Sequence, residues 1–377
     1  MKPLKTLKFA SVAILLAGAT MSQAETYKVG VINALTGTYA FGGVPIQNAM
    51  KLAIQHANES GELGDVTLEV VEGDSASDKG QTITLVSRLA QNDDLLIILG
   101  PTTSLEGTAG APVANEQKVA LFGIGSSRGI VEAGPWSFKV QQVGDDMLGE
   151  LSAYVAGKTD IKKVAVIFDR SNDGFVSQKN AFIKGLDGTD VDVVSEDGIL
   201  SSDTDFLAIA TRLASSDIDA FFVAAPAEVG GNVVVQLRQA GLPMNVPLVG
   251  PSSFATPAFI DTAGGAAEGS IVIADYFLKA ETEGNADFVT AYQEAYGELP
   301  DNWAAMGYAL ADLAVEAIKR AGPEPTRAKV REALAGLRDV PTILGNGTWT
   351  MDDDDFDPHY GAAILVVKDG DLMLAPE

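Results

Sequence analysis

The segment Leu95–Leu99 (LLIIL), followed at once by residues 100–104 (GPTTS), decides the fold. Five consecutive apolar residues are typical of a strand that is buried on both faces, as in a parallel sheet covered by helices. The Gly-Pro and Thr/Ser residues behind it predict a turn that leads into a helix. Similar pairs of a short apolar strand and an amphipathic helix recur on both sides of this segment. The sequence therefore predicts an α/β protein built from βα units.

The βα pattern occurs in two series. Residues 27–122 form the first, and residues 164–273 form the second. The segment that joins them, 136–142 (WSFKVQQ), lacks the Gly, Ser or Pro runs of a flexible linker. We interpret it as an ordered crossover strand. After Asp275 the pattern predicts mainly helices and two closing strands at 345–351 and 361–367, so we expect two doubly wound parallel-sheet lobes.

The first 24 residues have the organisation of a secretory signal peptide. Three lysines precede the apolar stretch 9–19 (FASVAILLAGA), and Ser22-Gln23-Ala24 offers the small-x-small pattern of a cleavage site. The apolar stretch is too short to span a bilayer. We expect cleavage after Ala24 and a mature protein located in the periplasm.

The composition favours binding over catalysis. The chain has a formal net charge of -25, and loss of the three signal-peptide lysines leaves about -28, which repels nucleic acid and anionic lipid. The chain has no cysteine and only two histidines, His56 and His359. Thiol chemistry is therefore excluded, and a histidine-based metal centre is disfavoured. We expect no cofactor, no metal and no nucleic-acid partner.

Four turns carry the chemistry that could bind a ligand, because ligands of open α/β sheets bind at the carboxyl ends of strands. These turns are 36–43 (TGTYAFGG), 100–104 (GPTTS), 123–127 (GIGSS) and 250–253 (GPSS). Glycine allows backbone N–H groups to approach a ligand, and hydroxyls at helix N-termini add donors. Such turns would suit a carboxylate, although the same residues also serve as ordinary caps.

Two motifs suggest other chemistry. Residues 125–129 (GSSRG) match the nucleophile-elbow pattern around Ser127, but His359 is the only later histidine and is expected to lie remote from it. Residues 352–355 (DDDD) with Asp357 invite a calcium interpretation, yet Pro358 and Ile364 stand where an EF-hand requires glycine and glutamate. We expect a solvated acidic turn there.

Over essentially the whole mature chain, the sequence resembles the leucine/isoleucine/valine-binding family of periplasmic solute-binding proteins, which serve ABC importers. The matching segments are 28–31 (KVGV), 35–37 (LTG), 74–78, 98–101 (ILGP), 164–169 with Gly174, and 237–242 (LRQAGL). The resemblance implies a type I periplasmic binding protein: two lobes joined by three crossover strands, with the ligand between them. We place lobe 1 at 25–141 and 276–349, and lobe 2 at 142–275 and 350–377.

The resemblance also implies ligand-binding residues. The family holds the ligand's carboxylate with hydroxyl and backbone N–H groups, whose positions match Ser104, Gly125 and Ser127 here, with Ser126 adjacent. Phe41 matches an aromatic residue of the first turn, and Tyr39 lies close to it in the chain. In the second lobe, Asp173 and Pro226 replace family aromatics. Ser252 stands where amino-acid binders carry the acid that pairs with the α-ammonium group. A buried unpaired ammonium costs several kcal/mol, so Ser252 favours other ligands unless Asp173 or Glu228 supplies the charge.

We therefore predict a receptor without enzymatic activity that closes two lobes on a small ligand. The expected ligand is an apolar amino acid, an organic or aromatic acid, or an amide, and the expected partner is a membrane ABC permease. We expect the protein to be a monomer. A sensor module of the same fold remains an alternative, and a secreted serine hydrolase that uses Ser127 is a more distant one.

Overall fold

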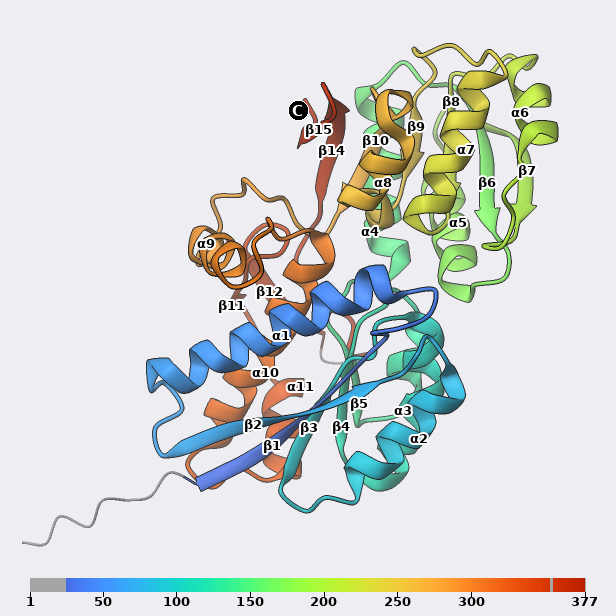
Figure 1. The fold of residues 1–377 in the computed structure, drawn as a ribbon. Coiled ribbons are helices and arrows are strands. Elements are labelled where there is room, and N and C mark those ends of the chain that lie inside the picture. Colours follow the sequence, from blue (N-terminus) through green and yellow to red (C-terminus); the bar gives the residue numbers. More distant parts are fainter. Residues whose placement is uncertain (1–24, 353–354, 377) are drawn as a thin grey trace, which may run out of the picture.

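The computed structural model describes residues 25–352 and 355–376, which form two α/β lobes (Figure 1). The first lobe contains a sheet of five parallel strands in the order β2-β1-β3-β4-β5. The LLIIL segment is its central strand β3, and all five of its residues are buried, as predicted. The strands are β1 (Glu25–Asn33), β2 (Val66–Asp74), β3 (Leu95–Leu99), β4 (Ala120–Gly123) and β5 (Ser137–Lys139).

The second lobe contains a seven-stranded sheet in the order β15-β14-β10-β9-β8-β6-β7. Its first five strands along the chain are parallel, whereas β14 and β15 are antiparallel and form one edge. The strands are β6 (Lys163–Asp169), β7 (Asp192–Ile199), β8 (Ala220–Ala224), β9 (Leu248–Gly250), β10 (Ile271–Ala274), β14 (Ala363–Lys368) and β15 (Asp371–Leu374).

Helices cover both faces of each sheet, as a doubly wound fold requires. Two separate apolar clusters flank the first sheet and two flank the second. The first lobe carries α1 (Ala40–Ser60), α2 (Lys79–Ala90), α3 (Ser104–Gln117), α9 (Asn285–Tyr296), α10 (Asn302–Ala321) and α11 (Arg327–Ala335). The second carries α4 (Gly144–Lys158), α5 (Asp173–Gly185), α6 (Leu207–Ala214), α7 (Ala227–Gln239) and α8 (Pro257–Ala263).

The late helices return to the first lobe because α10 has a long apolar face. Met306, Leu310 and Leu313 are buried in the core cluster that also contains Ile46 and Met50 of α1. Trp349 of β12 (Thr348–Met351) is buried in the same cluster. This strand forms a small antiparallel sheet with β11 (Val340–Pro341) and β13 (Pro358–His359).

Three chain segments pass between the lobes and are hydrogen-bonded to one another. Segment 136–142 was predicted to be a crossover strand as a whole, but its first part is β5, the edge of the first sheet, and the passage follows it. The Oε1 atom of Gln142, on this first passage, accepts from the Tyr360 N–H at 2.9 Å. Tyr360, on the third passage, donates its hydroxyl to Asp275, which begins the second. The third passage lies between β13, which pairs with β12 on the first lobe, and β14 of the second lobe, so it falls at 360–362; the predicted boundary was residue 350.

Several short elements were not anticipated from the sequence, among them α8 and β15. The helix α8 has seven residues, too few for a clear periodic pattern. The strand β15 is joined to β14 by Asp369-Gly370, both with positive φ, 54° and 78°. This Asp-Gly pair is a recognised hairpin signal and could have located the strand.

Candidate functional site

A cavity of about 60 Å³ lies between the lobes and is lined by residues of both. Of the predicted site residues, the structure brings seven together around it: Tyr39, Phe41, Ser104, Gly125, Ser126, Pro226 and Ser252. Ser127 and Asp173 do not line the cavity. Residues that line it without having been singled out from the sequence include Gln141, Asn172, Phe175, Gln178 and Trp303.

The N-terminus of α3 supplies hydrogen-bond donors on the first-lobe side. Thr103 caps this helix, since its Oγ1 accepts from the Glu106 N–H, and Glu106 in turn accepts from the Thr103 hydroxyl at 2.7 Å. This reciprocal pair resembles a capping box. It fixes Ser104 as the first helical residue, where backbone N–H groups have no partner within the helix and the dipole is positive. The site therefore favours negative charge.

The neighbouring turn fits closely against Ser104. Gly125 has a φ of 129°, and a Cβ there would lie 2.7 Å from the Ser104 Oγ, so this position requires glycine. The Ser127 N–H donates to the Ser104 Oγ at 3.3 Å, which leaves the Ser104 hydroxyl proton available to a ligand. The Ser127 hydroxyl accepts from the Gly129 N–H at 3.2 Å, so it caps the 3-10 turn that follows.

Aromatic side chains form the wall next to these donors. Phe41 lies edge-on to Trp303, with ring centroids 6.2 Å apart, and Tyr39 lies 6.2 Å from Phe41. Trp303 comes from α10, far along the chain from the first turn. Phe175 and Pro226 add apolar surface from the second lobe. The cavity thus combines a polar end with apolar walls, as ligand sites usually do.

The two lobes touch directly at the cavity. Asn172 caps α5 by accepting from the Gly174 N–H at 2.8 Å, and its amide donates to the Tyr39 hydroxyl at 2.7 Å. A Cβ on Gly174 would lie 3.3 Å from the Ser104 Oγ, so the backbone of α5 approaches α3 closely. These contacts describe a closed arrangement of the lobes.

Every described residue that lines the cavity is uncharged at neutral pH. Ser252 is buried on its wall, where the resemblance would place an acid. The suggested substitutes do not fill that role, since Asp173 and Glu228 are both exposed and lie outside the lining. The cavity therefore offers no carboxylate to an ammonium group.

Two buried polar atoms of the lining have no hydrogen-bond partner among the described residues: the Oε1 of Gln178 and the Nε1 of Trp303. Unpaired buried polar groups are costly, and in native proteins they point to a missing partner. Both atoms are therefore candidates for contact with a ligand.

A buried acid lies directly behind the cavity. Asp275 is fully buried, and burial raises the pKa of its carboxyl. It accepts hydrogen bonds from the Tyr360 hydroxyl, from the Asn302 amide at 3.4 Å and from the Gln141 amide at 3.1 Å. Gln141 lines the cavity, so it stands between this acid and the ligand space.

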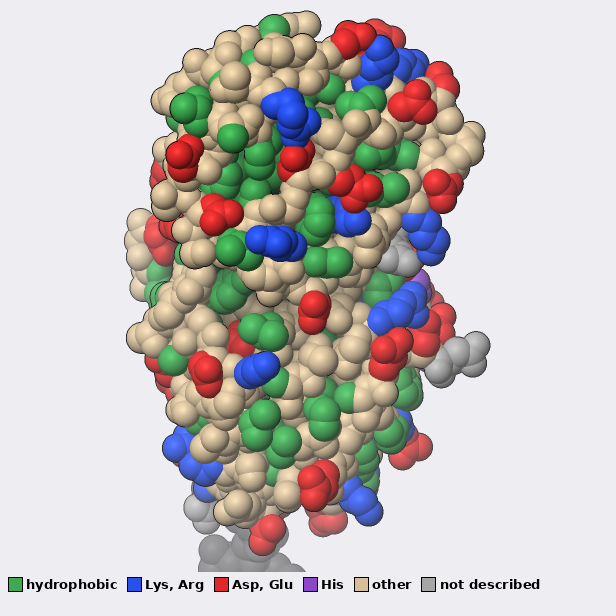
Figure 2. Space-filling view, turned by 90° about the vertical axis from the view of Figure 1, so that its right-hand side faces the viewer, with side chains coloured by type: hydrophobic (Ala, Val, Ile, Leu, Met, Phe, Trp, Pro, Cys, Tyr) green, Lys and Arg blue, Asp and Glu red, His purple; other side chains and the backbone are tan. Residues whose placement is uncertain are grey.

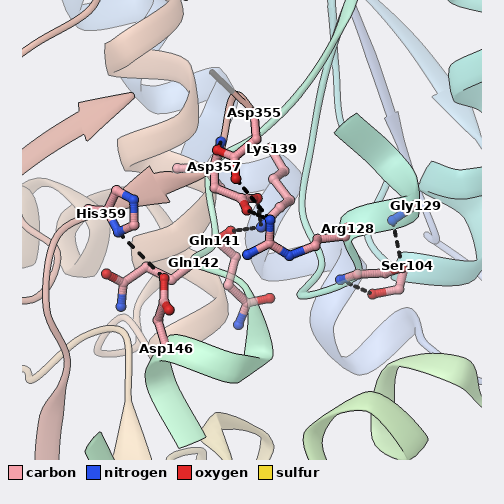
Figure 3. A network of polar contacts seen from close by, with 12 residues as sticks. Ser104, Arg128, Gly129, Lys139, Gln141, Gln142, Asp146, Asp355, Asp357 and His359 are labelled. Carbon is pink, nitrogen blue, oxygen red and sulfur yellow. Dashed lines mark hydrogen bonds and ion pairs between the residues drawn. The ribbon is translucent and has the colours of Figure 1, made fainter. Parts of the chain in front are cut away.

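The acidic segment before the third passage is not a solvated turn throughout, contrary to the expectation. Asp357 is only 1% exposed and forms ion pairs with Arg128 at 2.6 Å and with the wholly buried Lys139 at 3.3 Å (Figure 3). Asp353 and Asp354 lie outside the described residues. Burial lowers the pKa of Lys139 to about 8, while Asp357 acts against this shift. The cluster attaches this segment to the first lobe.

The geometry gives no hydrolase site around Ser127. The Ser127 hydroxyl accepts from Gly129, whereas the Nδ1 of His359 lies 3.5 Å from Asp146 of α4. The other histidine, His56 of α1, is partly buried, and its Nδ1 lies 3.3 Å from the hydroxyl of Tyr308 of α10.

The described part of the chain contains no cluster of three or more residues suited to hold a metal ion, and none of its helices is long and apolar enough to cross a membrane. On the face shown in Figure 2, basic and acidic side chains are interspersed and form no continuous basic patch. The proposed signal peptide, residues 1–24, lies outside the described residues.

Comparison with known proteins gives consistent relatives. Residues 26–371 match the sequence model of the family described as "Periplasmic binding protein". The Leu/Ile/Val-binding protein of Escherichia coli is 25% identical over 261 residues, which cover 69% of this chain and 70% of that protein. A Leu/Ile/Val-binding protein of Rhizobium johnstonii is 26% identical over 352 residues, which cover 92% and 93%.

Solved structures share the fold over nearly the whole chain. A solute-binding protein of an ABC transporter from Rhodopseudomonas palustris, in complex with 3,4-dihydroxybenzoic acid, has a TM-score of 0.80 and 27% identity, covering 92% of this chain and 95% of that one. A branched-chain amino acid transporter substrate-binding protein from Streptococcus pneumoniae, in complex with isoleucine, has a TM-score of 0.84 at 23% identity, covering 93% and 100%; this likeness concerns the fold.

The fold and the cavity define a two-lobed solute-binding protein. The chain belongs to the periplasmic binding protein family. This is a family of binding proteins and not of enzymes, and a solved structure 27% identical to this chain is the solute-binding protein of an ABC transporter. The predicted fold class, family and absence of enzymatic activity are therefore confirmed. The hydrolase and sensor alternatives receive no support from these comparisons.

Proposed function

We propose that this protein binds a small monocarboxylate or amide, without an α-ammonium group, between its lobes and delivers it to a membrane ABC permease. The observation that carries the proposal is the composition of the cavity. It has hydroxyl and N–H donors at the start of α3 and no charged side chain in its described lining.

The donor end suits a carboxylate or an amide oxygen. The hydroxyl of Ser104 can donate because its oxygen already accepts from the Ser127 N–H. The backbone N–H groups of the first turn of α3 lie beside it, and the helix dipole favours negative charge there. The Gly125-Ser126 turn completes this end, and Ser127 acts indirectly, since its N–H donates to the Ser104 Oγ.

The absence of an acid argues against an α-amino acid. An ammonium group closed into this cavity would lose its hydration without gaining an ionic partner, at a cost of several kcal/mol. Some relatives are named for leucine, isoleucine and valine, whereas the R. palustris protein was crystallised with an aromatic acid. The aromatic wall of Tyr39, Phe41 and Trp303 fits a ligand of the second kind.

Ligand capture would proceed by closure of the lobes. Because the cavity is lined by both lobes, a ligand stabilises the closed form by its contacts with each of them. We propose that the exported, monomeric protein, cleaved after Ala24, presents this closed form to the permease.

Mass spectrometry of the ligand released by unfolding freshly purified protein tests the proposal. We expect a monocarboxylate or an amide, and calorimetric titration of the stripped protein should reproduce its binding. Leucine, isoleucine and valine serve as the comparison set. Tight binding of these amino acids, with no binding of acids or amides, would show that the assigned ligand class is wrong.

A further inference from the structure

One residue of the cavity wall, Gln141, comes from a passage between the lobes and not from a strand-to-helix turn. Its Nε2 donates to Asp275 at 3.1 Å and to the Ser252 hydroxyl at 3.4 Å. An amide nitrogen carries two hydrogens, so both are occupied. The Oε1 atom receives no hydrogen bond from the described residues, and in Figure 3 it is drawn on the side of Ser104.

Asp275 determines which way this amide faces. The hydrogen bonds that Asp275 receives favour its ionised form against the effect of burial, and an ionised carboxylate only accepts hydrogen bonds. Turning the Gln141 amide over would place its oxygen against the Asp275 oxygen, two acceptors without a proton between them. Asp275 is itself held by Tyr360 and Asn302, which belong to other segments. Tyr360 on the third passage and Asn302 at the start of α10 therefore set the orientation of the amide through Asp275.

This orientation presents an acceptor to the cavity. Once a ligand fills the cavity, a carbonyl oxygen on its wall loses contact with water, so a ligand gains by offering O–H or N–H there. A second carboxylate would gain nothing, since it has no proton to donate and approaches the negative charge of Asp275. The cavity wall at Gln141 therefore requires a hydrogen-bond donor from the ligand, whereas the start of α3 requires an acceptor.

We propose that Gln141 is a specificity-determining residue that selects ligands with a hydroxyl or amide N–H donor in addition to their carboxylate, and that Asp275 is the positioning residue that orients it. The inference rests on the proposed function, because it assumes that a small carboxylate or amide occupies the cavity. It predicts discrimination between two acids that differ only by the donor.

The test uses two matched pairs of probes, 4-hydroxybenzoate with benzoate and 4-hydroxybutanoate with butanoate, titrated against the full mature protein. We expect the hydroxylated member of at least one pair to bind about tenfold or more tightly than its plain counterpart. Gln141→Met, which keeps the side-chain length, should reduce this ratio to near one by weakening the hydroxylated probe. Asp275→Asn, which can donate as well as accept, should also reduce the ratio by freeing the amide orientation.

Asn302→Ala is the matched control: it removes only the longer donor contact to the same Asp275 oxygen, at 3.4 Å, while Tyr360 still holds the carboxylate and the carboxylate still accepts from Gln141. It should lower stability but preserve the ratio. If Gln141→Met does not fold, the ratio measured with Asp275→Asn tests the inference in its place. An unchanged ratio in the variants, or equal binding of both members by the wild type, overturns the inference and leaves the proposed function standing. If no probe binds, the ligand released by unfolding is the deciding evidence. A carboxylate or amide without a further hydrogen-bond donor overturns only the role of Gln141. A ligand of neither class overturns both that role and the proposed function.

Discussion

The side-chain amide of Asn172, in the second lobe, donates a 2.7 Å hydrogen bond to the hydroxyl of Tyr39, in the first. The same Asn172 caps α5 through its Oδ1. One side chain thus fixes the start of a second-lobe helix and holds that helix against the first lobe. The bond exists only while the lobes are closed, so it contributes to the equilibrium that a ligand shifts.

Removal of this bond should weaken ligand binding. Tyr39→Phe deletes the hydroxyl and keeps the ring that faces Phe41, so we expect affinity to fall about three- to tenfold, the worth of one hydrogen bond. Calorimetric titration with the released ligand measures the change. Asn172→Ser is the matched partner variant, because serine still caps α5 but is too short to reach Tyr39. If either variant binds as tightly as the wild type, the bond does not contribute to closure.

Replacement of Ser104 should affect the carboxylate end. Ser104→Ala removes a hydroxyl that can donate to an anion, so we expect affinity for an acidic ligand to fall about ten- to a hundredfold. Ser127→Ala is its control, because the Ser127 side chain only caps the following turn, and its backbone N–H is unaffected. We expect its affinity to change less than about threefold. The reverse order of the two effects would place the grip on the Ser127 hydroxyl.

The buried pair of Lys139 and Asp357 should be important for stability. Asp357→Asn leaves Lys139 buried without its counter-ion, which should cost about 3–5 kcal/mol at neutral pH. Asp355→Asn removes a half-exposed partner of Arg128 and should cost at most about 1 kcal/mol. Urea unfolding measures both. Similar losses in the two variants would contradict the assigned role of burial.

The cost of Asp357→Asn should also depend on pH. The pKa of Lys139 in the folded protein is about 8, below the ordinary 10.5, so between these values the folded state binds fewer protons than the unfolded state. The free energy of unfolding therefore rises with pH between about 8 and 10.5, because the cost of burying a charged Lys139 disappears. Because Asp357 raises the pKa of Lys139 and a neutral lysine needs no counter-ion, the difference in stability between variant and wild type should shrink as pH rises towards about 8 and stay small above it. A constant difference from pH 6 to pH 10 would exclude this explanation.

The contribution of Asp301, the N-cap of α10, to the stability of the folded protein should fall as pH rises. Burial raises the pKa of its carboxyl from 3.8 to about 6, so the folded state binds more protons between these values and loses stability as pH rises through them. Asparagine caps equally well and carries no charge. Asp301→Asn should therefore stabilise the protein at pH 7 by about 1–2 kcal/mol and have little effect at pH 4.

Thermal unfolding at these two pH values measures this effect. The control is Asp78→Asn, because Asp78 caps α2 through the same type of bond but is exposed. We expect no such pH-dependent gain there. Stabilisation of both variants to the same extent would attribute the effect to overall negative charge and not to burial of Asp301.

Much of the fold follows from local pattern. The LLIIL strand, the amphipathic helices and the turns after the strands could be predicted because hydrophobic periodicity and capping residues act over a few neighbours. The helix α8 and the strand β15 escaped prediction because short elements carry few periods. The buried state of Asp357 could not be inferred either, since a run of acidic residues looks the same whether a buried lysine meets it or not.

The candidate site divides in the same way. Ser104, Gly125 and Ser126 could be predicted because turns at the carboxyl ends of neighbouring parallel strands must meet at one edge of the sheet. Trp303 and Gln178 gave no signal, because each sits in an ordinary helical pattern and reaches the cavity only through the packing of its helix. Asp173 lies in a suitable turn, yet its side chain is exposed outside the cavity lining.

The sequence by itself determined the architecture, the resemblance to the periplasmic binding proteins and the polar end of the cavity, all of which depend on residues close together in the chain. Only the tertiary structure decided which residues lie opposite the polar end of the cavity. The pairing of Tyr39 with Asn172 and of Gln141 with Asp275 joins residues more than a hundred positions apart. Such pairs leave no mark on local pattern, because they form only when both lobes and all three passages between them are in place.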